Sequence, residues 1–410
     1  MSFYSFDVWM VVAWSLAAMW TVILGAFLIS CRGPAKLRQL GDRKGSADQV
    51  RLSVIVAARN EECCIENCLR SLLRQDHPNF EVIAVNDRST DQTAQILERL
   101  ATEFAGQLKV IHVTTLAHGW FGKPHALNLA MQSATGEALL FTDADCEYQS
   151  PSALRTTVDD LYRRNLDFLS VAARYTMDSL RERVLVPCCS EALLTWLRPE
   201  RIEDPEWPEA FANGAFILVR RASFEQIGGW GAVRSKISED LELARLTKRS
   251  GQKIGIAYGD DFYETGSYAT RRDSWNGWCR ILKGVLSPSR LSITLARMSV
   301  LFLLPFVMTV WGVWHSVSTG SIDWFLGGPG LGFAIAFGCR CVLDAIMFRL
   351  VGSSVWVIPF APLGRLFVMA ASIKALCSHA GWVNTHWRGA MFSAGQLVMP
   401  RHVKPKTQIQ

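Results

Sequence analysis

The sequence predicts an α/β domain with a mostly parallel sheet, flanked at both ends by apolar helices that belong in a membrane. Two patterns predict this fold class. Between residues 51 and 285, short apolar runs alternate with segments of helical periodicity, which is typical of βαβ units. Before and after that range, nearly uncharged stretches are long enough to cross a hydrocarbon layer of ~30 Å.

The first apolar stretch, residues 8–30, carries no charged side chain. A cleavable signal peptide would have a basic segment in front of a shorter core, and residues 1–7 contain neither Lys nor Arg. We therefore expect a retained anchor. Basic residues follow it, among them Arg32, Lys36 and Arg38. By the positive-inside rule they place the domain on the cytoplasmic side of the cell (inner) membrane.

The domain begins with three strands separated by helices. Residues 52–58 and 80–85 are apolar runs typical of buried strands, and residues 109–113 form a shorter third strand. Residues 65–73 and the segment around Ile96 have helical periodicity. Ser89 or Thr90 is expected to cap the second of these helices. Crossover helices between strands imply parallel pairing.

Acidic residues follow the next predicted strand, residues 138–141. Asp143 and Asp145 are two positions apart, so on a strand both carboxylates would lie on one face. Such a pair suits a hard divalent cation, Mg²⁺ or Mn²⁺, which can neutralise a diphosphate. Glu61 and Asp87 follow the first two strands, so all four carboxylates are expected at one sheet edge.

Three other groups have a structural as well as a functional interpretation. Lys123 could be an ordinary surface lysine, but Gly122 and Pro124 fix a turn around it and favour a positioned side chain. Glu239 and Asp240 precede an amphipathic helix and could simply be charges at its start. His125 is better interpreted as a helix-start or packing residue than as a ligand.

The C-terminal third is predicted to hold two to three further membrane segments within residues 299–378. Arg340 and Asp344 are four positions apart and could pair there, although we prefer the interpretation that both snorkel to the interface. Pro359 and Pro362 interrupt the last segment, which could re-enter the membrane without crossing it. The basic tail would then lie on the cytoplasmic side.

These patterns divide the chain into six regions. They are residues 1–31 (N-terminal transmembrane anchor), 32–50 (basic linker), 51–285 (α/β domain), 286–298 (interfacial segment), 299–378 (membrane segments) and 379–410 (basic tail). The net charge of +6 is explained by basic residues that flank apolar segments, so we expect anionic lipid headgroups and no nucleic acid as partners. The 11 cysteines are scattered, and Cys63, Cys64 and Cys68 fit a packed helix rather than a zinc site.

Five motifs, taken together in this order, are far more specific than any one alone. They are residues 53–62 (SVIVAARNEE), 87–91 (DRSTD), 122–128 (GKPHALN), 143–145 (DAD) and 238–240 (SED). Over residues ~50 to 285 the chain resembles the family 2 glycosyltransferases, which have the nucleotide-diphospho-sugar-binding GT-A fold, related to the Rossmann fold.

The resemblance implies a set of roles. Ala57, Glu61 and Asp87 would lie around the nucleotide base and ribose. Lys123 and Asp143 would approach the donor, and Asp143 and Asp145 the metal, with Asp145 holding it. Asp240 would be the catalytic base of an inverting transfer, most plausibly from a UDP-sugar.

Three departures refine this comparison. Ala57 stands where many members have Pro, and Asn86 replaces the first Asp of a usual Asp-Asp pair. The Gln-x-x-Arg-Trp motif of processive polysaccharide synthases is absent; residues 271–280 (RRDSWNGWCR) instead resemble the lipid-directed subgroup of hopanoid-associated, carotenoid and ceramide glycosyltransferases. A lipid acceptor is therefore expected. Trp278 would usually be an interfacial belt residue, and Arg280 would meet lipid phosphate or donor diphosphate, with Glu239 in a positioning role.

Two alternatives remain beside this hypothesis. One is a polysaccharide synthase, which the small number of membrane segments disfavours. The other is a non-catalytic membrane receptor that keeps a degenerate nucleotide-sugar domain. A degenerate domain should have lost a charged group, whereas Lys123, Asp143, Asp145 and Asp240 are all present.

Overall fold

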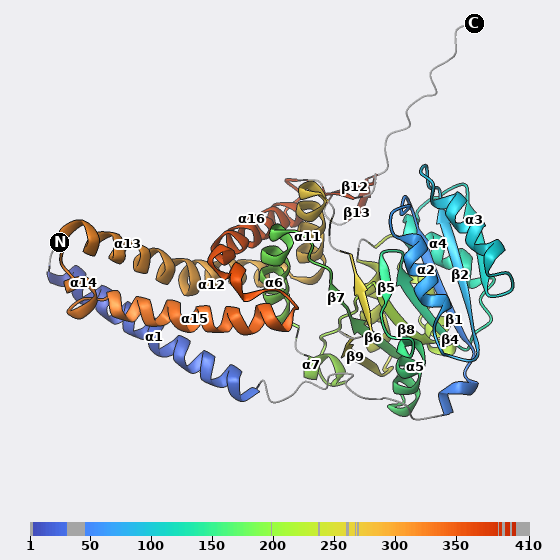
Figure 1. Cartoon of the computed structure of the whole chain (residues 1–410), viewed down its shortest axis with the longest axis horizontal. Coiled ribbons are helices and arrows are strands. Elements are labelled where there is room, and N and C mark those ends of the chain that lie inside the picture. The colour runs from blue at the N-terminus through green and yellow to red at the C-terminus, as the bar shows by residue number, and fades with distance from the viewer. Residues whose placement is uncertain are drawn as a thin grey trace, which may run out of the picture. The chain divides into compact units, whose positions relative to one another are not determined.

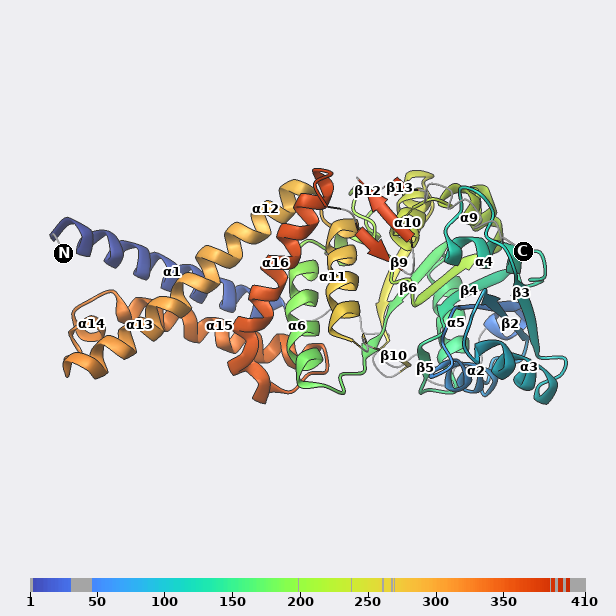
Figure 2. The ribbon, with the colours of Figure 1, turned by 90° about the horizontal axis from the view of Figure 1, so that it is seen from above.

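The computed structural model describes residues 3–30, 46–197, 199–236, 238–259, 262–266, 268, 270–383, 385–387, 390–393 and 396–398. Two compact units make up the chain. Residues 35–176, 197–285 and 377–410 form the α/β unit, and residues 1–34, 177–196 and 286–376 form the apolar-helix unit. Residues 177–196 thus pack with the apolar helices, although they lie inside the sequence range 51–285. The elements of both units are labelled in Figures 1 and 2.

A seven-stranded sheet is the centre of the α/β unit, with the order β3-β2-β1-β4-β8-β6-β9. Only β8 runs antiparallel to its neighbours, which confirms the predicted mostly parallel sheet. The strands are β1 (Leu52–Ala58), β2 (Phe80–Asp87), β3 (Leu108–Val113), β4 (Ala138–Asp143), β6 (Phe168–Ala172), β8 (Phe216–Arg220) and β9 (Ile254–Tyr258).

Helices cover both faces of this sheet. On one face, side chains such as Val54, Val56 and Leu140 share a core with α2, α3 and α5. On the other face, Phe141 of β4 meets Phe224 of α8 and Trp230 of α9. The helices of the unit are α2 (Ile65–Leu73), α3 (Thr93–Glu103), α4 (Gly122–Met131), α5 (Ala153–Arg163), α7 (Pro199–Glu203), α8 (Arg221–Gln226), α9 (Gly229–Ala232), α10 (Glu239–Arg249) and α11 (Arg271–Val285).

The predicted cap of α3 is wrong. The helix begins at Thr93, and the Thr93 backbone N–H donates to Asp91 Oδ1 at 3.0 Å. Ser89 instead uses its hydroxyl to accept from the backbone N–H of Asn60, at 3.1 Å. The Ser89 hydroxyl therefore binds the loop after β1 instead of capping α3. The Asp91 carboxylate, which is closer to the helix, accepts from the backbone N–H of Thr93 in its place.

Two small sheets complete the α/β unit. One contains β5 (Cys146–Tyr148), β10 (Tyr263–Thr265) and β7 (Arg174–Tyr175), and β5 begins directly after Asp145. The other contains β11 (Thr385–Trp387), β12 (Ala390–Ser393) and β13 (Gln396–Val398) in the range predicted as a tail. Most of the predicted basic linker and the last residues of the tail lie outside the described residues.

The apolar-helix unit contains long helices from both ends of the chain. Among the described residues, four helical stretches are long and apolar enough to cross a membrane: Val8–Ala26, Pro288–Thr319, Gly330–Leu350 and Val355–His379. The elements are α1 (Phe3–Ser30), α6 (Leu180–Leu194), α12 (Pro288–Arg297), a π-helical turn (Met298–Leu303), α13 (Leu304–Thr319), α14 (Asp323–Leu326), α15 (Gly330–Leu350), a 3₁₀ turn (Val355–Phe360) and α16 (Ala361–His379).

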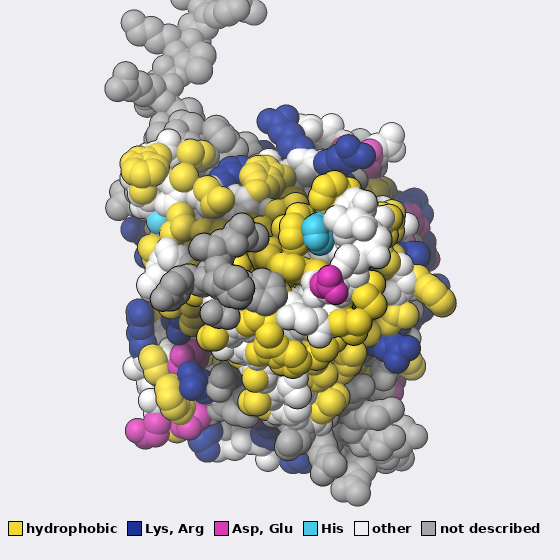
Figure 3. All heavy atoms as spheres, turned by 90° about the vertical axis from the view of Figure 1, so that its left-hand side faces the viewer, with side chains coloured by type: hydrophobic (Ala, Val, Ile, Leu, Met, Phe, Trp, Pro, Cys, Tyr) yellow, Lys and Arg dark blue, Asp and Glu magenta, His cyan; other side chains and the backbone are white. Residues whose placement is uncertain are grey.

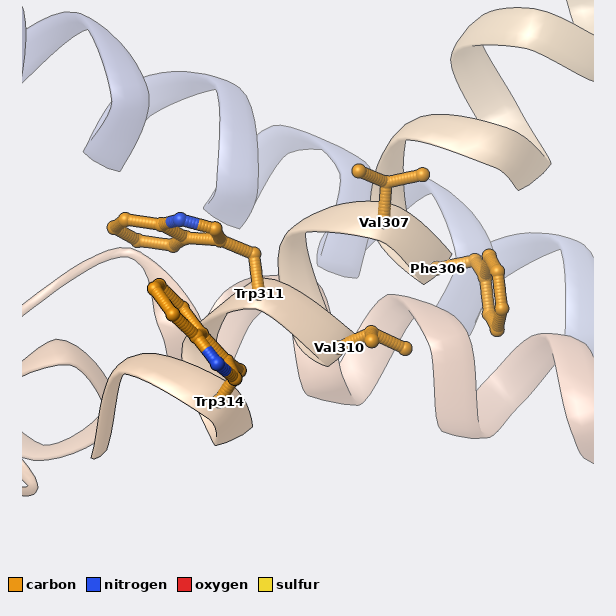
Figure 4. Close-up of a pocket in the computed structure, with 5 residues that line it drawn as sticks. All are labelled: Phe306, Val307, Val310, Trp311 and Trp314. Atoms are coloured by element: carbon orange, nitrogen blue, oxygen red, sulfur yellow. The ribbon is translucent and has the colours of Figure 1, made fainter. Parts of the chain in front are cut away.

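Close packing joins the first and third of these stretches. A Cβ on Gly332 of α15 would lie 2.8 Å from the carbonyl carbon of Ala13 in α1, so only glycine allows the two backbones to approach this closely. The outer surface is apolar. Figure 3 shows many hydrophobic side chains on the face on the side of α13 and α14, with a histidine and an acidic side chain among them. Figure 4 shows a shallow hollow on α13 lined by Phe306, Val307, Val310, Trp311 and Trp314.

One cluster of charged side chains in this unit joins three helices, and we call it the paired ion cluster: Glu191 of α6, Arg340 and Asp344 of α15, and Arg365 of α16. Arg340 donates to both oxygens of Glu191, at 2.7 and 2.5 Å, and also to Asp344. Arg365 donates to Glu191 at 3.1 Å and to Asp344. Arg340 and Asp344 are buried, so the preferred snorkelling interpretation is wrong; each has found charged partners on other helices.

Candidate active site

The carboxyl ends of three neighbouring strands form one edge of the α/β unit. In register, Ala57 of β1 lies between Val85 of β2 and Asp143 of β4. β2 ends at Asp87 and β4 ends at Asp143, and Glu61 follows β1 by three residues. The sheet therefore brings together the strand ends that the sequence predicted.

The loops after β1 and β2 are bonded to each other through several hydrogen bonds. Thr90 donates its backbone N–H to Asn60 Oδ1 at 2.8 Å, Glu61 donates its own to Thr93 Oγ1 at 2.9 Å, and Gln92 donates to Glu62 Oε2 at 2.9 Å. Asn60 and Arg88 hold φ angles of 56° and 57°, a conformation that is uncommon for residues other than glycine. This mutual support fixes the positions of Glu61 and Asp87.

Asp87 is buried at this edge and its two oxygens are held by one guanidinium. Arg88 Nε lies 2.7 Å from Oδ1, and the Arg88 terminal NH2 lies 3.0 Å from Oδ2. Gly122, the first residue of α4, packs against this pair: a Cβ there would lie 2.6 Å from Asp87 Oδ2. The sequence indicated Gly122 only as a turn residue; its close contact with Asp87 gives a second reason for glycine.

Residues after Gly122 have different roles. His125 is buried and meets the Trp120 ring edge to face at 5.7 Å, in agreement with the predicted packing role. Lys123 instead points to the acidic residues of the site. Its Nζ lies 2.5 Å from Asp143 Oδ1 and 3.7 Å from Glu239 Oε1, and it donates to the carbonyl oxygen of Gly214 at 3.3 Å. Lys123 is thus a positioned side chain, as the flanking Gly and Pro predicted.

Electrostatics keep this lysine charged. Burial alone lowers the pKa of Lys123, but Asp143, Glu239 and Asp240 outweigh burial, and the pKa is raised above its ordinary value. Burial raises the pKa of the Glu239 carboxyl, and Lys123 opposes that effect. The two groups are therefore coupled across the 3.7 Å gap.

Asp240 lies in the first turn of α10, beside the same lysine. A Cβ on Gly214 would lie 2.9 Å from Asp240 Oδ2 and 3.4 Å from Lys123 Nζ. Gly214 therefore packs against both charged groups, and a larger residue would displace them. Asp240 Oδ1 accepts from the backbone N–H of Leu241 at 2.7 Å.

Helix α11 brings Arg280 and Trp278 to the unit's interior. Burial alone lowers the pKa of Arg280, but Tyr268, Glu239 and Asp240 raise it, so the guanidinium is charged among these groups. Trp278 is buried and meets the Tyr268 ring edge to face at 6.5 Å, so it is not an interfacial belt residue. Tyr268 also packs on Gly277, where a Cβ would lie 2.1 Å from its ring; we had not predicted a role for this tyrosine.

The chemistry of the donor set fits a Mg²⁺-type ion. Asp143 is the last residue of β4 and Asp145 lies in the turn between β4 and β5, so the two carboxylates do not share one strand. Mg²⁺ is commonly bound by one or two carboxylates together with substrate phosphates. Among the described residues there is no group of three or more His, Cys, Asp or Glu side chains placed to hold a metal. The thiol of Cys68 is buried and donates to the backbone carbonyl of Asp143 at 3.5 Å.

Several known proteins are similar to this chain in sequence or in structure. Residues 53–228 match the model of glycosyl transferase family 2. A beta-monoglucosyldiacylglycerol synthase of Nostoc sp. is 32% identical over 196 residues, which cover 47% of this chain and 40% of that protein. A poly(ribitol-phosphate) beta-N-acetylglucosaminyltransferase of Staphylococcus aureus is 30% identical over 234 residues, which cover 52% of this chain and 39% of that protein.

A third relative has a lipid in its name. The 4,4'-diaponeurosporenoate glycosyltransferase of Staphylococcus aureus is 33% identical over 136 residues, 33% of each chain. The chain thus spans less than half the length of each of these three relatives. Among solved structures, a mannosyltransferase of Pyrobaculum calidifontis in complex with GDP-Man and Mn²⁺ covers 90% of this chain and 99% of its own, with a TM-score of 0.50 and 18% identity. This likeness confirms the predicted fold class.

Proposed function

Residues 53–228 match glycosyl transferase family 2, and from this match we propose that the chain transfers a sugar from a nucleotide-diphospho-sugar, with a UDP-sugar as the first candidate, to a lipid acceptor with inversion. One observation carries the proposal. At the carboxyl edge of the sheet, Lys123 lies among Asp143, Glu239 and Asp240, where a diphosphate and a proton acceptor are both needed. Ala57, Glu61 and Asp87 line the same edge and would meet the base and ribose.

Each residue then has a task in the transfer. Asp240 takes the proton from the acceptor hydroxyl, whose oxygen attacks the anomeric carbon on the side opposite the diphosphate. Lys123 and Arg280 offer positive charge to the diphosphate, and Glu239 orients Lys123. Asp143 and Asp145 would hold a divalent cation, which when bound stabilises negative charge on the departing diphosphate.

The lipid acceptor is supported from outside the site. Long apolar helices flank the α/β unit in sequence, and α13 presents a hollow of Trp, Phe and Val side chains that suits acyl chains. Two relatives are named for diacylglycerol and for the carotenoid acid diaponeurosporenoate. The poly(ribitol-phosphate) relative represents the alternative, a polymer acceptor.

The proposed location is the cell (inner) membrane with the α/β unit in the cytoplasm. The basic residues after the first apolar helix support this orientation by the positive-inside rule. A single cysteine at Gln410, in a background without native cysteines, tests the side of the tail. If the segment with Pro359 and Pro362 re-enters, the thiol should resist impermeant reagents until the membrane is opened; labelling in intact cells would show that this segment crosses.

Mass analysis of lipids tests the function itself. Cells that express the wild-type chain should accumulate a lipid heavier by one sugar residue, and cells that express Asp240→Asn or an empty vector should not. The same extracts are analysed for polymer-bound sugar. A new glycosylated polymer without a new glycolipid would show that the acceptor is a polymer and not a lipid. No difference in the lipids or in the polymer-bound sugar would contradict a transferase role.

A further inference from the structure

We propose that the ammonium of Lys123 occupies the cation position at Asp143 when no donor is bound, so that a divalent cation binds well only together with a diphosphate. The inference rests on the proposed function and adds an order of events to it. It starts from a distance: Lys123 Nζ lies 2.5 Å from Asp143 Oδ1, so the two groups are in direct ion-pair contact.

The ammonium and a metal ion compete for the same oxygen. A divalent ion on Asp143 Oδ1 would lie at about 2.0–2.1 Å, the distance at which carboxylates bind Mg²⁺. With Lys123 still at 2.5 Å from that oxygen, the singly charged ammonium and the doubly charged metal ion would repel each other. The site is partly buried, so water screens this repulsion poorly. Lys123 must therefore release Asp143 before the oxygen can serve a metal.

The backbone on both sides of Lys123 is closely packed. Gly122 beside it is pressed against Asp87, with no space even for a Cβ, and Pro124 after it is buried. The release must come from the side chain. That side chain already has two other partners within reach, the carbonyl oxygen of Gly214 at 3.3 Å and Glu239 Oε1 at 3.7 Å.

A diphosphate supplies the missing acceptor. Its oxygens can take over the ammonium, which leaves Asp143 free for the metal, and its negative charge offsets the repulsion between the two cations. Metal and diphosphate should therefore raise each other's affinity by the same factor, because binding linkage is reciprocal. Removal of the lysine's charge should abolish the part of this coupling that Lys123 causes.

Measurement of Mn²⁺ binding to the full-length protein in detergent tests this role, with free Mn²⁺ followed by its electron paramagnetic resonance signal. In the wild type, Mn²⁺ alone should bind weakly and UDP should tighten it. Lys123→Gln should bind Mn²⁺ at least about tenfold tighter than the wild type without UDP. Lys123→Arg, which keeps the positive charge, should not show this tighter binding of Mn²⁺ alone. Lys109→Gln, which removes an exposed lysine on β3, should bind Mn²⁺ as the wild type does.

The possible results distinguish failure of the competition between Lys123 and the metal from failure of the proposed function. If Lys123→Gln and the wild type bind Mn²⁺ alone equally, while UDP still tightens Mn²⁺ in the wild type, the competition is refuted and the proposed function stands. If the wild type binds Mn²⁺ neither alone nor with UDP, the metal-dependent function itself fails. Should Lys123→Gln not fold, as judged by circular dichroism, Lys123→Met carries the same expectation.

Discussion

Two of the charged clusters among the described residues, one in each unit, are built on different principles. The paired ion cluster of the apolar-helix unit has two arginines and two carboxylates, and each arginine donates to both carboxylates. The cluster of the α/β unit sets Lys123 and Arg280 against three carboxylates, those of Asp143, Glu239 and Asp240. The first is balanced, whereas the second has an excess of negative charge.

The two clusters also differ in their access to solvent. The side chain of Asp344 is 2% exposed, whereas that of Asp143 is 36% exposed. A charge-balanced set of ion pairs whose arginines and Asp344 are buried is suited to holding helices together, because its charges already satisfy one another. An open site with surplus carboxylates can accept a cation. The comparison therefore separates a structural cluster from a catalytic one, and mutations should divide in the same way.

The largest effect on stability is expected for Glu191→Ala. This change leaves two buried arginines to share Asp344, and removal of one partner of a buried ion pair costs about 3–5 kcal/mol of unfolding free energy. Denaturant titration of the protein in detergent measures it. Glu225→Ala, which breaks an exposed pair with Arg221, is the control and should be nearly neutral. An equally small loss for Glu191→Ala would show that the cluster does not stabilise the helices.

Asp145→Ala should act on ligand binding and leave the fold intact. We expect this variant to lose turnover and to bind UDP more weakly in the presence of a divalent cation. Calorimetry with UDP and Mn²⁺ or Mg²⁺ measures the binding. Glu147→Ala, two residues further on the exposed side of β5, is the matched control and should bind like the wild type. Metal-dependent binding that survives in Asp145→Ala would remove this residue from the metal site.

The smallest effect in the catalytic cluster is expected for Glu239→Gln. Glutamine keeps the size of the side chain and can still accept from Lys123, so the rate of sugar transfer should fall less than in Asp240→Asn. Steady-state kinetics with both variants check this order. A larger loss for Glu239→Gln than for Asp240→Asn would exchange their roles and make Glu239, whose pKa burial raises, the candidate base.

The sequence predicted the α/β cluster far better than the paired ion cluster. Strand ends converge by a general rule of parallel sheets, so the edge at which Asp87 and Asp143 meet could be inferred from the order of apolar runs. Contacts that depend on side-chain packing could not, such as Gly122 against Asp87 or Gly214 beneath Asp240.

Glu191 shows a second limit. It is 149 residues from Arg340 and 174 from Arg365, and nothing in its local pattern indicates a partner at such a separation. Without that partner, Arg340 and Asp344 were best interpreted as snorkelling residues, which the structure contradicts. Ser89 was likewise assigned to its own helix because the loop that takes its hydroxyl is 29 residues away.

The most direct test of the account is sugar transfer by purified Asp240→Asn. Asparagine keeps the size of the side chain but cannot take the acceptor proton, so turnover should fall by at least about 10²-fold, the lower end for general base catalysis. Unfolding and UDP binding with Mn²⁺, measured on the same preparation, should remain as in the wild type. Transfer at a near-normal rate by this variant would contradict the assignment of Asp240 as the base and reduce the acidic pair at residues 239 and 240 to the start of a helix.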